Sequence, residues 1–174
     1  LALRAGSAWP AEGASLGAYA GPLRDCVVAL KYGGRHRTAT RLSVRLLESG
    51  RCRHILSASD VILGVPLHPD RERGRGFNQA DLLARALARN CGLPVSRGLA
   101  RTRNTRSQTA LSAGDRRRNV RAAFAVRPDP LLEGAAVALV DDVTTTGATL
   151  RECAAVLLAG GAREVRSITV ARAE

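Results

Sequence analysis

One stretch of the sequence, VALVDDVTTTGATL at residues 137–150, brings together groups that bind opposite charges. An apolar run typical of a buried strand stops at Asp141 and Asp142, and three threonines and Gly147 follow at once. Two neighbouring carboxylates repel each other, so a ligand or a counter-charge must offset that cost. Carboxylates accept hydrogen bonds from hydroxyl groups and from the waters around a cation. The pair therefore indicates a polar ligand site.

The residues after the acids are suited to binding an anion. A helix is expected to begin near Ala148 or Thr149, and the free N–H groups and dipole of a helix start favour negative charge. Threonine hydroxyls add donors, and Gly147 lets the backbone approach a ligand closely. Donors for a phosphate thus stand beside acceptors for hydroxyl groups, and a ribose phosphate presents both partners.

Other interpretations account for less of this stretch. P-loop ATPases also have an apolar strand that ends in acids, but they need a Gly-x-x-x-x-Gly-Lys-Ser/Thr loop, and the one lysine, Lys31, lies in LKYGG. No Gly-x-Gly-x-x-Gly follows a strand, so a dinucleotide fold lacks its fingerprint. A purely structural role as a helix cap explains Thr146 or Thr149, but not the second acid and three hydroxyls together.

The elements that must position these residues alternate between apolar runs and amphipathic helices. Strands are expected within residues 60–66, 93–101, 122–126, 135–140 and 164–172, and helices within 22–32, 35–47, 78–92 and 149–161. This alternation predicts a parallel α/β sheet, which binds ligands at the carboxyl ends of its strands. Residues 1–20 are expected to be an irregular arm, and residues 21–174 a single domain.

Composition narrows the class of protein. With 45% hydrophobic residues among 174, the chain can bury a core, and its net charge of +12 favours polyanions such as phosphorylated small molecules or nucleic acid. The four cysteines form no Cys-x-x-Cys pair, so we expect reduced, mostly buried thiols rather than a zinc site or a disulfide framework. No apolar run approaches about 18 residues and no leader is recognisable, so a cytoplasmic protein is expected.

The segment 101–121 departs from the periodic pattern, because it holds seven arginines and a single acid. A loop of this length in a compact domain is usually functional or disordered. From its residues alone, a solvated insertion and a basic flap that closes over an anion are equally good interpretations.

The stretch at residues 137–150 resembles the phosphoribosyl pyrophosphate (PRPP) motif of type I phosphoribosyltransferases. ALKYGGR, VPLHPDRERGRGFNQADLLARALA and TRSQTALSAGDRRRNVRAAFAV resemble, in the same order, the ComF family of competence proteins. The most diagnostic parts are RGFNQA and the pattern of Gln108, Leu111, Arg116 and Asn119. The likeness runs over about residues 23–171. The N-terminal four-cysteine zinc module of many members is absent, so this is either a naturally short member or a portion that starts after the module.

The resemblance implies an open, mainly parallel sheet flanked by helices, with residues 101–121 as a basic mobile hood loop. It implies that Asp141 and Asp142 are the catalytic candidates and hold the ribose hydroxyls of PRPP. The remaining PRPP-binding candidates, which would cradle the 5-phosphate, are Thr144, Thr145, Thr146, Gly147, Ala148 and Thr149. Mg²⁺ is the implied cofactor, carried on PRPP itself with no direct protein ligand.

Arginines are the implied partners of the leaving pyrophosphate, because the guanidinium fork is always charged. The candidates are Arg71, Arg73, Arg75, Arg106, Arg117 and Arg118. Lys31 is a further candidate for a phosphate or acceptor contact, although a role as a cation at a helix C-terminus is favoured. Tyr32 and Phe77 are expected to be packing residues rather than base-stacking platforms.

Two functions are compatible with these patterns. The first is Mg²⁺-dependent transfer of a phosphoribosyl group from PRPP to an acceptor that no motif identifies. The alternative is a non-catalytic, PRPP-responsive component of DNA uptake in natural transformation, with single-stranded DNA and proteins of the competence machinery as partners and no contact with membrane.

Overall fold

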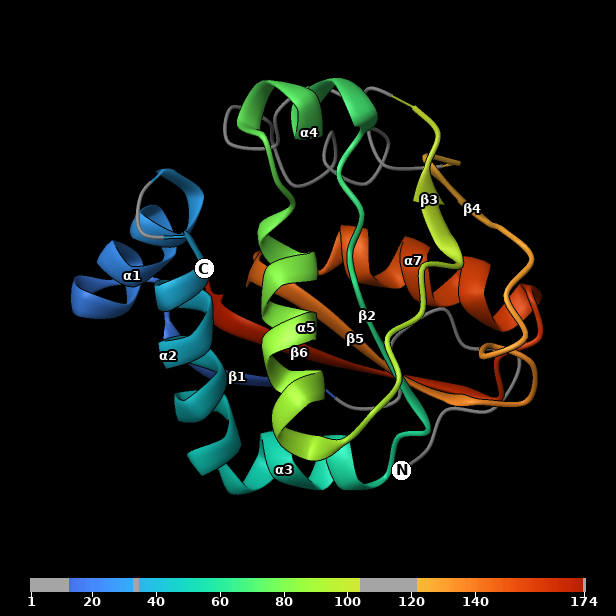
Figure 1. Cartoon of the computed structure of the whole chain (residues 1–174), viewed down its shortest axis with the longest axis horizontal. Helices are drawn as coiled ribbons and strands as arrows, with labels where there is room; N and C mark the ends of the chain where they lie inside the picture. Colours follow the sequence, from blue (N-terminus) through green and yellow to red (C-terminus); the bar gives the residue numbers. More distant parts are fainter. Residues whose placement is uncertain (1–12, 33–34, 104–121, 174) are drawn as a thin grey trace.

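A computed structural model of the chain describes residues 13–32, 35–103 and 122–173. Its centre is a sheet of four parallel strands in the order β1 (Gly13–Ala18), β6 (Glu164–Arg172), β5 (Ala136–Thr144) and β2 (Val61–Gly64) (Figure 1). A short antiparallel pair, β3 (Leu99–Arg101) and β4 (Phe124–Val126), lies apart from it. The predicted open parallel sheet flanked by helices is confirmed.

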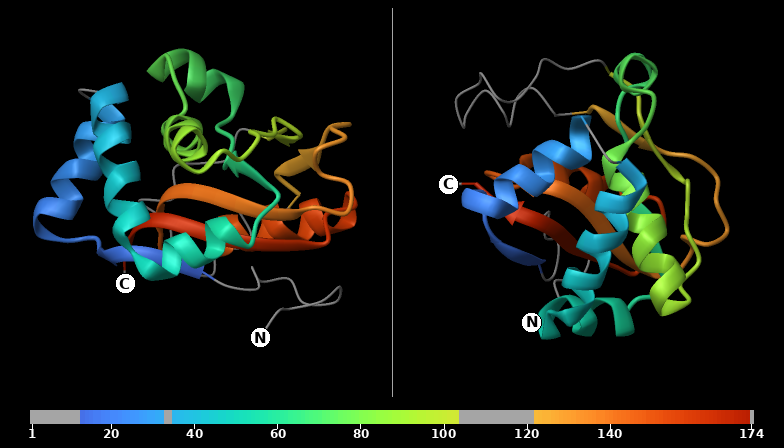
Figure 2. Two further views of the ribbon diagram at one scale, coloured as in Figure 1. Left: turned by 60° about the horizontal axis from the view of Figure 1, so that its bottom comes forward. Right: turned by 60° about the vertical axis from the view of Figure 1, so that its left-hand side comes forward.

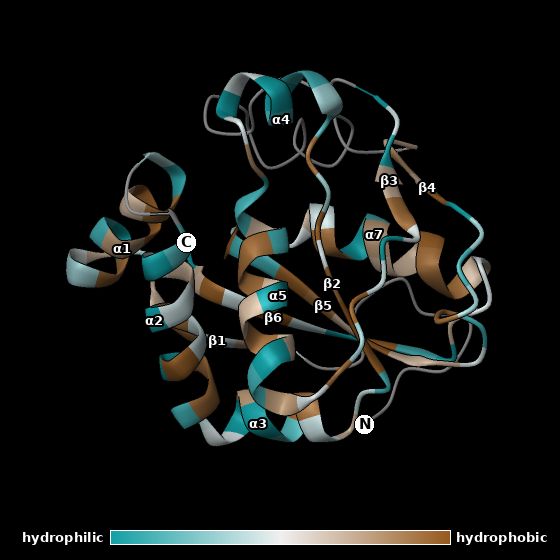
Figure 3. Cartoon of the chain, viewed as in Figure 1, coloured by the Kyte–Doolittle hydropathy of each residue, from teal (hydrophilic) through white to brown (hydrophobic). Residues whose placement is uncertain are grey.

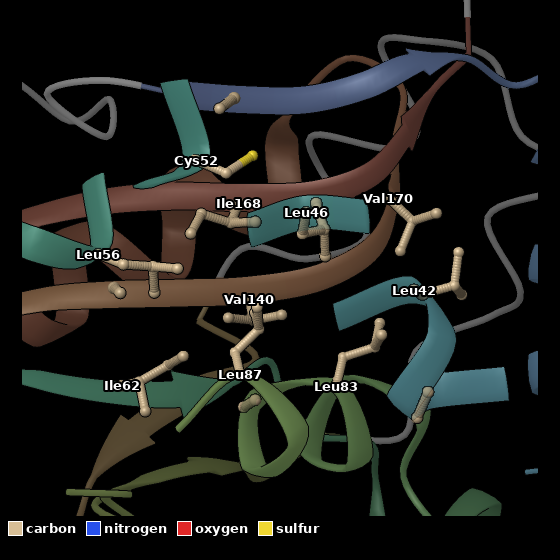
Figure 4. Close-up of a cluster of buried hydrophobic side chains, with 14 of the residues drawn as sticks. Leu42, Leu46, Cys52, Leu56, Ile62, Leu83, Leu87, Val140, Ile168 and Val170 are labelled. Atoms are coloured by element: carbon tan, nitrogen blue, oxygen red, sulfur yellow. The ribbon is translucent and has the colours of Figure 1, made fainter. Parts of the chain in front are cut away.

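Helices cover both faces of the sheet because the strands are apolar on both sides. On one face lie α1 (Gly21–Tyr32), α2 (Arg35–Glu48), α3 (Gly50–Ser57) and α5 (Gln79–Cys91), and on the other lies α7 (Ala148–Ala159) with the β3–β4 pair. Figure 4 shows Val140 of the sheet next to Leu87 of α5, and Ile168 near Leu46 of α2 and Cys52 of α3. In Figure 3, brown and teal residues alternate along α2 and α5, and the buried residues of the two helices, such as Leu42, Leu46, Leu83 and Leu87, form the stripes that the helical spacing predicted.

Helix α4 (Pro69–Arg75) stands between β2 and α5, and both views of Figure 2 show it at the top of the molecule. His68 caps its start, since its Nδ1 accepts a hydrogen bond from the N–H of Asp70. Gly76 ends it with a left-handed φ of 79°, which favours glycine. Asn78 then caps α5 by accepting from the N–H groups of Ala80 and Asp81. These caps give the RGFNQA motif a structural purpose.

Several sequence predictions are corrected by the structure. Residues 13–18, expected within an irregular arm, form strand β1, because they pair with β6 at the edge of the sheet. The predicted strand at 93–101 is shorter and is joined to the main sheet only by a bridge from Val95 to Ile62. Two of the four cysteines are exposed rather than mostly buried, namely Cys26 and Cys91.

The acid pair lies inside a strand rather than after one. β5 continues to Thr144, because its pairing with β6 runs on to the partner Arg172. Residues 104–121, which contain most of the expected hood loop with Arg106, Arg117 and Arg118, lie outside the described residues. Within the described part of the chain, no helix has the length and apolarity needed to cross a membrane.

Candidate functional site

A pocket of about 380 Å³ opens at the carboxyl end of the parallel sheet. Its wall includes the residues that directly follow β1, β2 and β6, which are Tyr19, Val65 and Ala173, and the last residues of β5. All four parallel strands therefore converge on it, as expected for an open α/β fold. The wall is completed from α1, α4, α5, α7 and β3.

Asp141 and Asp142 both line the pocket and interact directly, since, besides the effect of burial, the negative charge of Asp142 and a side-chain hydrogen bond with it both raise the pKa of Asp141. Each carboxylate also accepts a hydrogen bond from the next backbone N–H, over 2.8 Å in both cases. The two carboxyl groups therefore lie together in the wall of one pocket.

Asp142 is buried, with 5% of its surface exposed, and it has a cationic partner. The ammonium of Lys31, in the last turn of α1, lies 2.9 Å from its Oδ2. Burial lowers the pKa of Lys31, but the charges of Asp142 and Asp141 and the hydrogen bond to Asp142 outweigh that effect and raise it. Lys31 is therefore more than a helix-terminal cation, the interpretation that the sequence favoured: it neutralises one of the two acids.

Asp141 is in a different electrostatic position. Burial, followed by the negative charge of Asp142, raises the pKa of Asp141 well above its ordinary value, and Lys31 compensates only in part. The protein without ligand therefore disfavours the ionised form of Asp141 relative to an exposed aspartate. Hydrogen-bond donors on a ligand would favour the ionised form instead.

The threonine loop forms the next part of the wall. Thr144, Thr145, Gly147, Ala148 and Thr149 line the pocket, and α7 begins at Ala148 as predicted. Gly147 precedes the helix with a left-handed φ of 71°, a conformation that most residues adopt only at a cost. The first turn of α7, whose N–H groups have no carbonyl partner within the helix, therefore lines a concave, water-accessible space.

Thr146 is the one residue of this loop that does not line the pocket. It lines a second cavity of about 540 Å³, behind the loop, together with Ser15 and Arg172. Its hydroxyl accepts a long hydrogen bond of 3.4 Å from the N–H of Ala148, and its carbonyl accepts one of 2.5 Å from Arg151. These bonds hold the loop in shape.

The arginine candidates divide according to the helix that carries them. Arg71 and Arg75 line the pocket, whereas Arg73 pairs with Asp70 at the surface. Residues four apart share a face of a helix and residues two apart do not. Helix α4 therefore presents Arg71 and Arg75 to the pocket and Arg73 to another side. Arg106, Arg117 and Arg118 lie outside the described residues.

Three pocket residues with polar side chains were missed by the sequence predictions, namely Tyr19, Gln79 and Arg101. Arg101 ends β3 and is only 8% exposed, with its guanidinium 5.3 Å from the centre of the Phe124 ring. Burial and the positive charge of Arg71 lower the pKa of Arg101. An anion near both would relieve that repulsion. Gln79 lies in RGFNQA, a motif that could have drawn attention to it.

Comparison with known proteins identifies the family. The phosphoribosyl transferase domain matches residues 53–174, which contain the acid pair, the threonine loop and the arginines of α4. This chain belongs to the phosphoribosyltransferase family. Within that family it belongs to the ComF group. It is 42% identical over 153 residues to the DNA utilization protein YhgH of Escherichia coli O157:H7, and 36% identical over 163 residues to competence protein F of Haemophilus influenzae.

The alignments cover most of this chain, at 85% and 91%, but 66% and 71% of those relatives. The chain therefore spans about two thirds of their length. Among solved structures it is similar to the allosteric regulatory enzyme of purine biosynthesis, with a TM-score of 0.54 and 25% identity over 83% of this chain and 30% of that one. The glutamine PRPP amidotransferase of Bacillus subtilis gives a TM-score of 0.55 at 24% identity, over 82% and 30%. The ComF chain thus has the fold of the type I phosphoribosyltransferases.

Proposed function

We propose that this ComF-group protein binds PRPP in the pocket at the carboxyl end of its sheet and transfers the phosphoribosyl group to an acceptor. The observation that carries the proposal is the convergence of three kinds of group on one pocket. Two carboxylates, the N-terminus of α7 with its threonines, and the cations Lys31, Arg71 and Arg101 all line it. PRPP presents hydroxyl groups, a monophosphate and a pyrophosphate, and each matches one of these groups.

In this proposal the threonine loop and the start of α7 bind the 5-phosphate, and Asp141 and Asp142 accept hydrogen bonds from the ribose hydroxyls. The guanidinium groups of Arg71 and Arg101 stabilise the negative charge that develops on the leaving pyrophosphate. As the bond from the anomeric carbon to the pyrophosphate oxygen breaks, positive charge builds on the ribose ring, as in glycoside cleavage. The acceptor supplies the electron pair for the new bond.

Mg²⁺ belongs to this proposal as a companion of PRPP. Within the described residues no group of three or more His, Cys, Asp or Glu side chains gathers to hold a metal. Two carboxylates in the pocket, one already paired with Lys31, suit a hydrated ion that is held mainly by ligand phosphates. Asp141 is the residue that would accept hydrogen bonds from its waters. When bound, Mg²⁺ would neutralise charge on the pyrophosphate.

Calorimetric titration with PRPP and Mg²⁺ tests the proposal. We expect the wild type to bind, and the double variant Asp141→Asn/Asp142→Asn to bind about 100-fold more weakly or worse, since hydrogen bonds to charged groups are lost. A matched control, Asp25→Asn/Glu48→Gln, removes two exposed acids and should change the affinity little. No binding by the wild type would contradict the proposal. Binding without pyrophosphate release, with any amine or base as acceptor, would restrict it to recognition of PRPP.

A second function, binding of single-stranded DNA, is favoured by separate observations. The net charge is +12, and the relatives include proteins named for DNA utilization and competence. Exposed arginines also line α2 and α3, namely Arg37, Arg41, Arg51 and Arg53. Phosphate contacts of this kind produce an affinity that falls steeply with salt.

Fluorescence anisotropy of a labelled single strand, repeated over a series of salt concentrations, tests this second function. Arg37→Gln/Arg41→Gln should weaken binding to all sequences and flatten the salt dependence, by about 0.7 in the logarithmic slope for each arginine that no longer neutralises a phosphate. An affinity that is equal at low and high salt would count against DNA binding.

A further inference from the structure

We propose that Glu152 of α7 is a positioning residue for Arg101 and acts through a hydrogen bond to the backbone of Ala122. The inference deepens the proposed function, on which it rests, because it names what holds a pyrophosphate-binding guanidinium in the pocket wall. Neither Glu152 nor Ala122 lines the pocket itself. Their effect on a ligand is therefore indirect.

The position of Arg101 depends on strand β4. Arg101 is the last residue of β3, which within the described residues forms a two-stranded sheet with β4. It is paired with Phe124, the first residue of β4, and its guanidinium lies 5.3 Å from the centre of that buried ring. The similar contact of Arg75 with Tyr32 has no such anchor, because Tyr32 is 74% exposed and is not the packing residue that the sequence predicted. A shift of β4 would therefore move Arg101.

Ala122, at the entry to β4, has an unusual backbone conformation. Its φ is 53°, and in the described part of the chain it is the one residue other than glycine with a positive φ. Residues that carry a Cβ adopt this left-handed region only at a cost. Ala122 is exposed, whereas Ala123 and Phe124 directly after it are buried, so apolar packing does not hold Ala122 in place. Another interaction must offset the cost.

Glu152 supplies that interaction. Its Oε1 accepts a hydrogen bond of 2.6 Å from the N–H of Ala122, across 30 positions of sequence. Apolar contacts between β4 and α7 are non-directional, whereas a short hydrogen bond to a carboxylate fixes both distance and direction. Glu152 lies one helical turn after Ala148, where α7 lines the pocket. The bond thus ties the start of β4 to the part of α7 that borders the pocket.

A second hydrogen bond carries the position of β4 on to β3. The N–H of Thr102, the residue after Arg101, donates to the carbonyl of Ala123 over 2.9 Å. A fixed backbone matters here because burial and the positive charge of Arg71 both disfavour the cation of Arg101 and lower its pKa. If the tie to α7 were lost, Arg101 would be free to move away from Arg71 and out of the pocket wall.

Calorimetric titrations with two probes test the inference. Inorganic pyrophosphate with Mg²⁺ probes the cations of the wall, and ribose 5-phosphate probes the threonine loop and the acid pair. Glu152→Ala should weaken pyrophosphate binding about 2- to 10-fold, the range for loss of one hydrogen bond, and should leave the affinity for ribose 5-phosphate unchanged. Glu152→Gln keeps an acceptor oxygen and should stay closer to wild type.

The sign of the change separates positioning from general electrostatics. Removal of an acid makes the protein more positive, which by itself would strengthen the binding of an anion. Glu133→Ala, which removes an exposed acid elsewhere, is the matched control and should bind pyrophosphate as well as wild type or slightly better. A loss in Glu152→Ala is therefore opposite to the effect of charge alone.

Ala122→Gly provides a rescue, because glycine adopts a positive φ freely. The double variant Glu152→Ala/Ala122→Gly should recover pyrophosphate affinity relative to Glu152→Ala, which a general loss of stability would not allow. The inference is overturned if Glu152→Ala matches wild type, if Glu133→Ala shows the same loss, if both probes weaken equally, or if the double variant binds pyrophosphate no better than Glu152→Ala.

Hydrogen exchange of the Thr102 N–H separates this inference from the proposed function. The exchange should be faster in Glu152→Ala than in wild type and slower again in the double variant. If wild type binds neither probe, the proposed binding of PRPP fails, and the exchange rates still test the tie between β4 and α7. Equal rates in wild type and Glu152→Ala would overturn the inference even if pyrophosphate binds.

Discussion

The ammonium of Lys31 lies 2.9 Å from the Oδ2 of Asp142, which ties the last turn of α1 to the interior of β5. Lys31 is the one lysine of the chain, and it lies outside residues 53–174, the part that matches the phosphoribosyl transferase domain. The N-terminal helix is therefore joined to the candidate site by a charge and not only by apolar packing.

Lys31→Met should destabilise the protein. The substitution leaves the carboxylate of Asp142 buried without its cation, and loss of one partner from such a pair costs up to about 3–5 kcal/mol when both are buried. Because 24% of the Lys31 side chain is exposed, we expect about 1–3 kcal/mol, measured by urea unfolding. The double variant Lys31→Met/Asp142→Asn should recover part of the loss. If the loss of unfolding free energy in the double variant equals the sum of the losses in the two single variants, the pair contributes nothing to stability.

Asp141→Asn should make the protein without ligand more stable at neutral pH. The folded protein holds the Asp141 proton more tightly than the unfolded chain, whose ordinary pKa is 3.8. The stability that this group contributes is present below that pH and is lost as the pH rises through the raised value. Asparagine does not titrate, so the variant does not lose this stability. The difference in the free energy of unfolding between the variant and the wild type should therefore grow from about pH 4 upward. Asp25→Asn, at an exposed position, is the control, and parallel pH profiles for wild type and Asp141→Asn would contradict the prediction.

Arg101→Met should weaken the binding of inorganic pyrophosphate about 10-fold or more, because a charge-assisted hydrogen bond is removed. Methionine retains the apolar contact with Phe124, so the fold should survive. Arg73→Met is the matched control, since it removes the same charge from a residue that does not line the pocket. Competition of pyrophosphate with PRPP in calorimetry measures the pyrophosphate affinity of both variants. Similar losses in the two variants would show a general effect of charge.

Gly64→Ala should destabilise the chain by about 2 kcal/mol or more through overpacking. A Cβ at Gly64, the last residue of β2, would lie 2.5 Å from backbone atoms of Ala80 and Asp81 in the first turn of α5. The helix would have to move away from the sheet, and it carries Gln79 into the pocket wall. Gly74→Ala in α4, where a Cβ meets nothing within 4 Å, should be neutral or slightly stabilising. Urea unfolding of both variants measures these changes in the free energy of unfolding.

Local patterns predicted the elements that depend on near neighbours. The apolar stripes of α2 and α5 include Leu42, Leu46, Leu83 and Leu87, and all of them are buried as the helical spacing required. Patterns failed where pairing with a distant segment decides the conformation. β1 has no strong strand signal, but β6 offers it an edge to pair with. α4 contains one arginine-glycine step and ends at a second, and its caps at His68 and Gly76 stabilise it.

The sequence by itself determined the chemistry of the site: two adjacent acids, a threonine and glycine loop, and a helix start that favours an anion. These features follow one another along the chain, so their spacing alone was sufficient. The partners of these groups were decided only by the tertiary structure. Lys31 forms an ion pair with Asp142, and Arg101 lies close enough to Arg71 to be affected by its charge. Both pairs are far apart in sequence and come together because all four parallel strands converge on one pocket. The same convergence places the ammonium of Lys31 2.9 Å from Oδ2 of Asp142, so that acid is neutralised while the neighbouring Asp141 is left for a ligand.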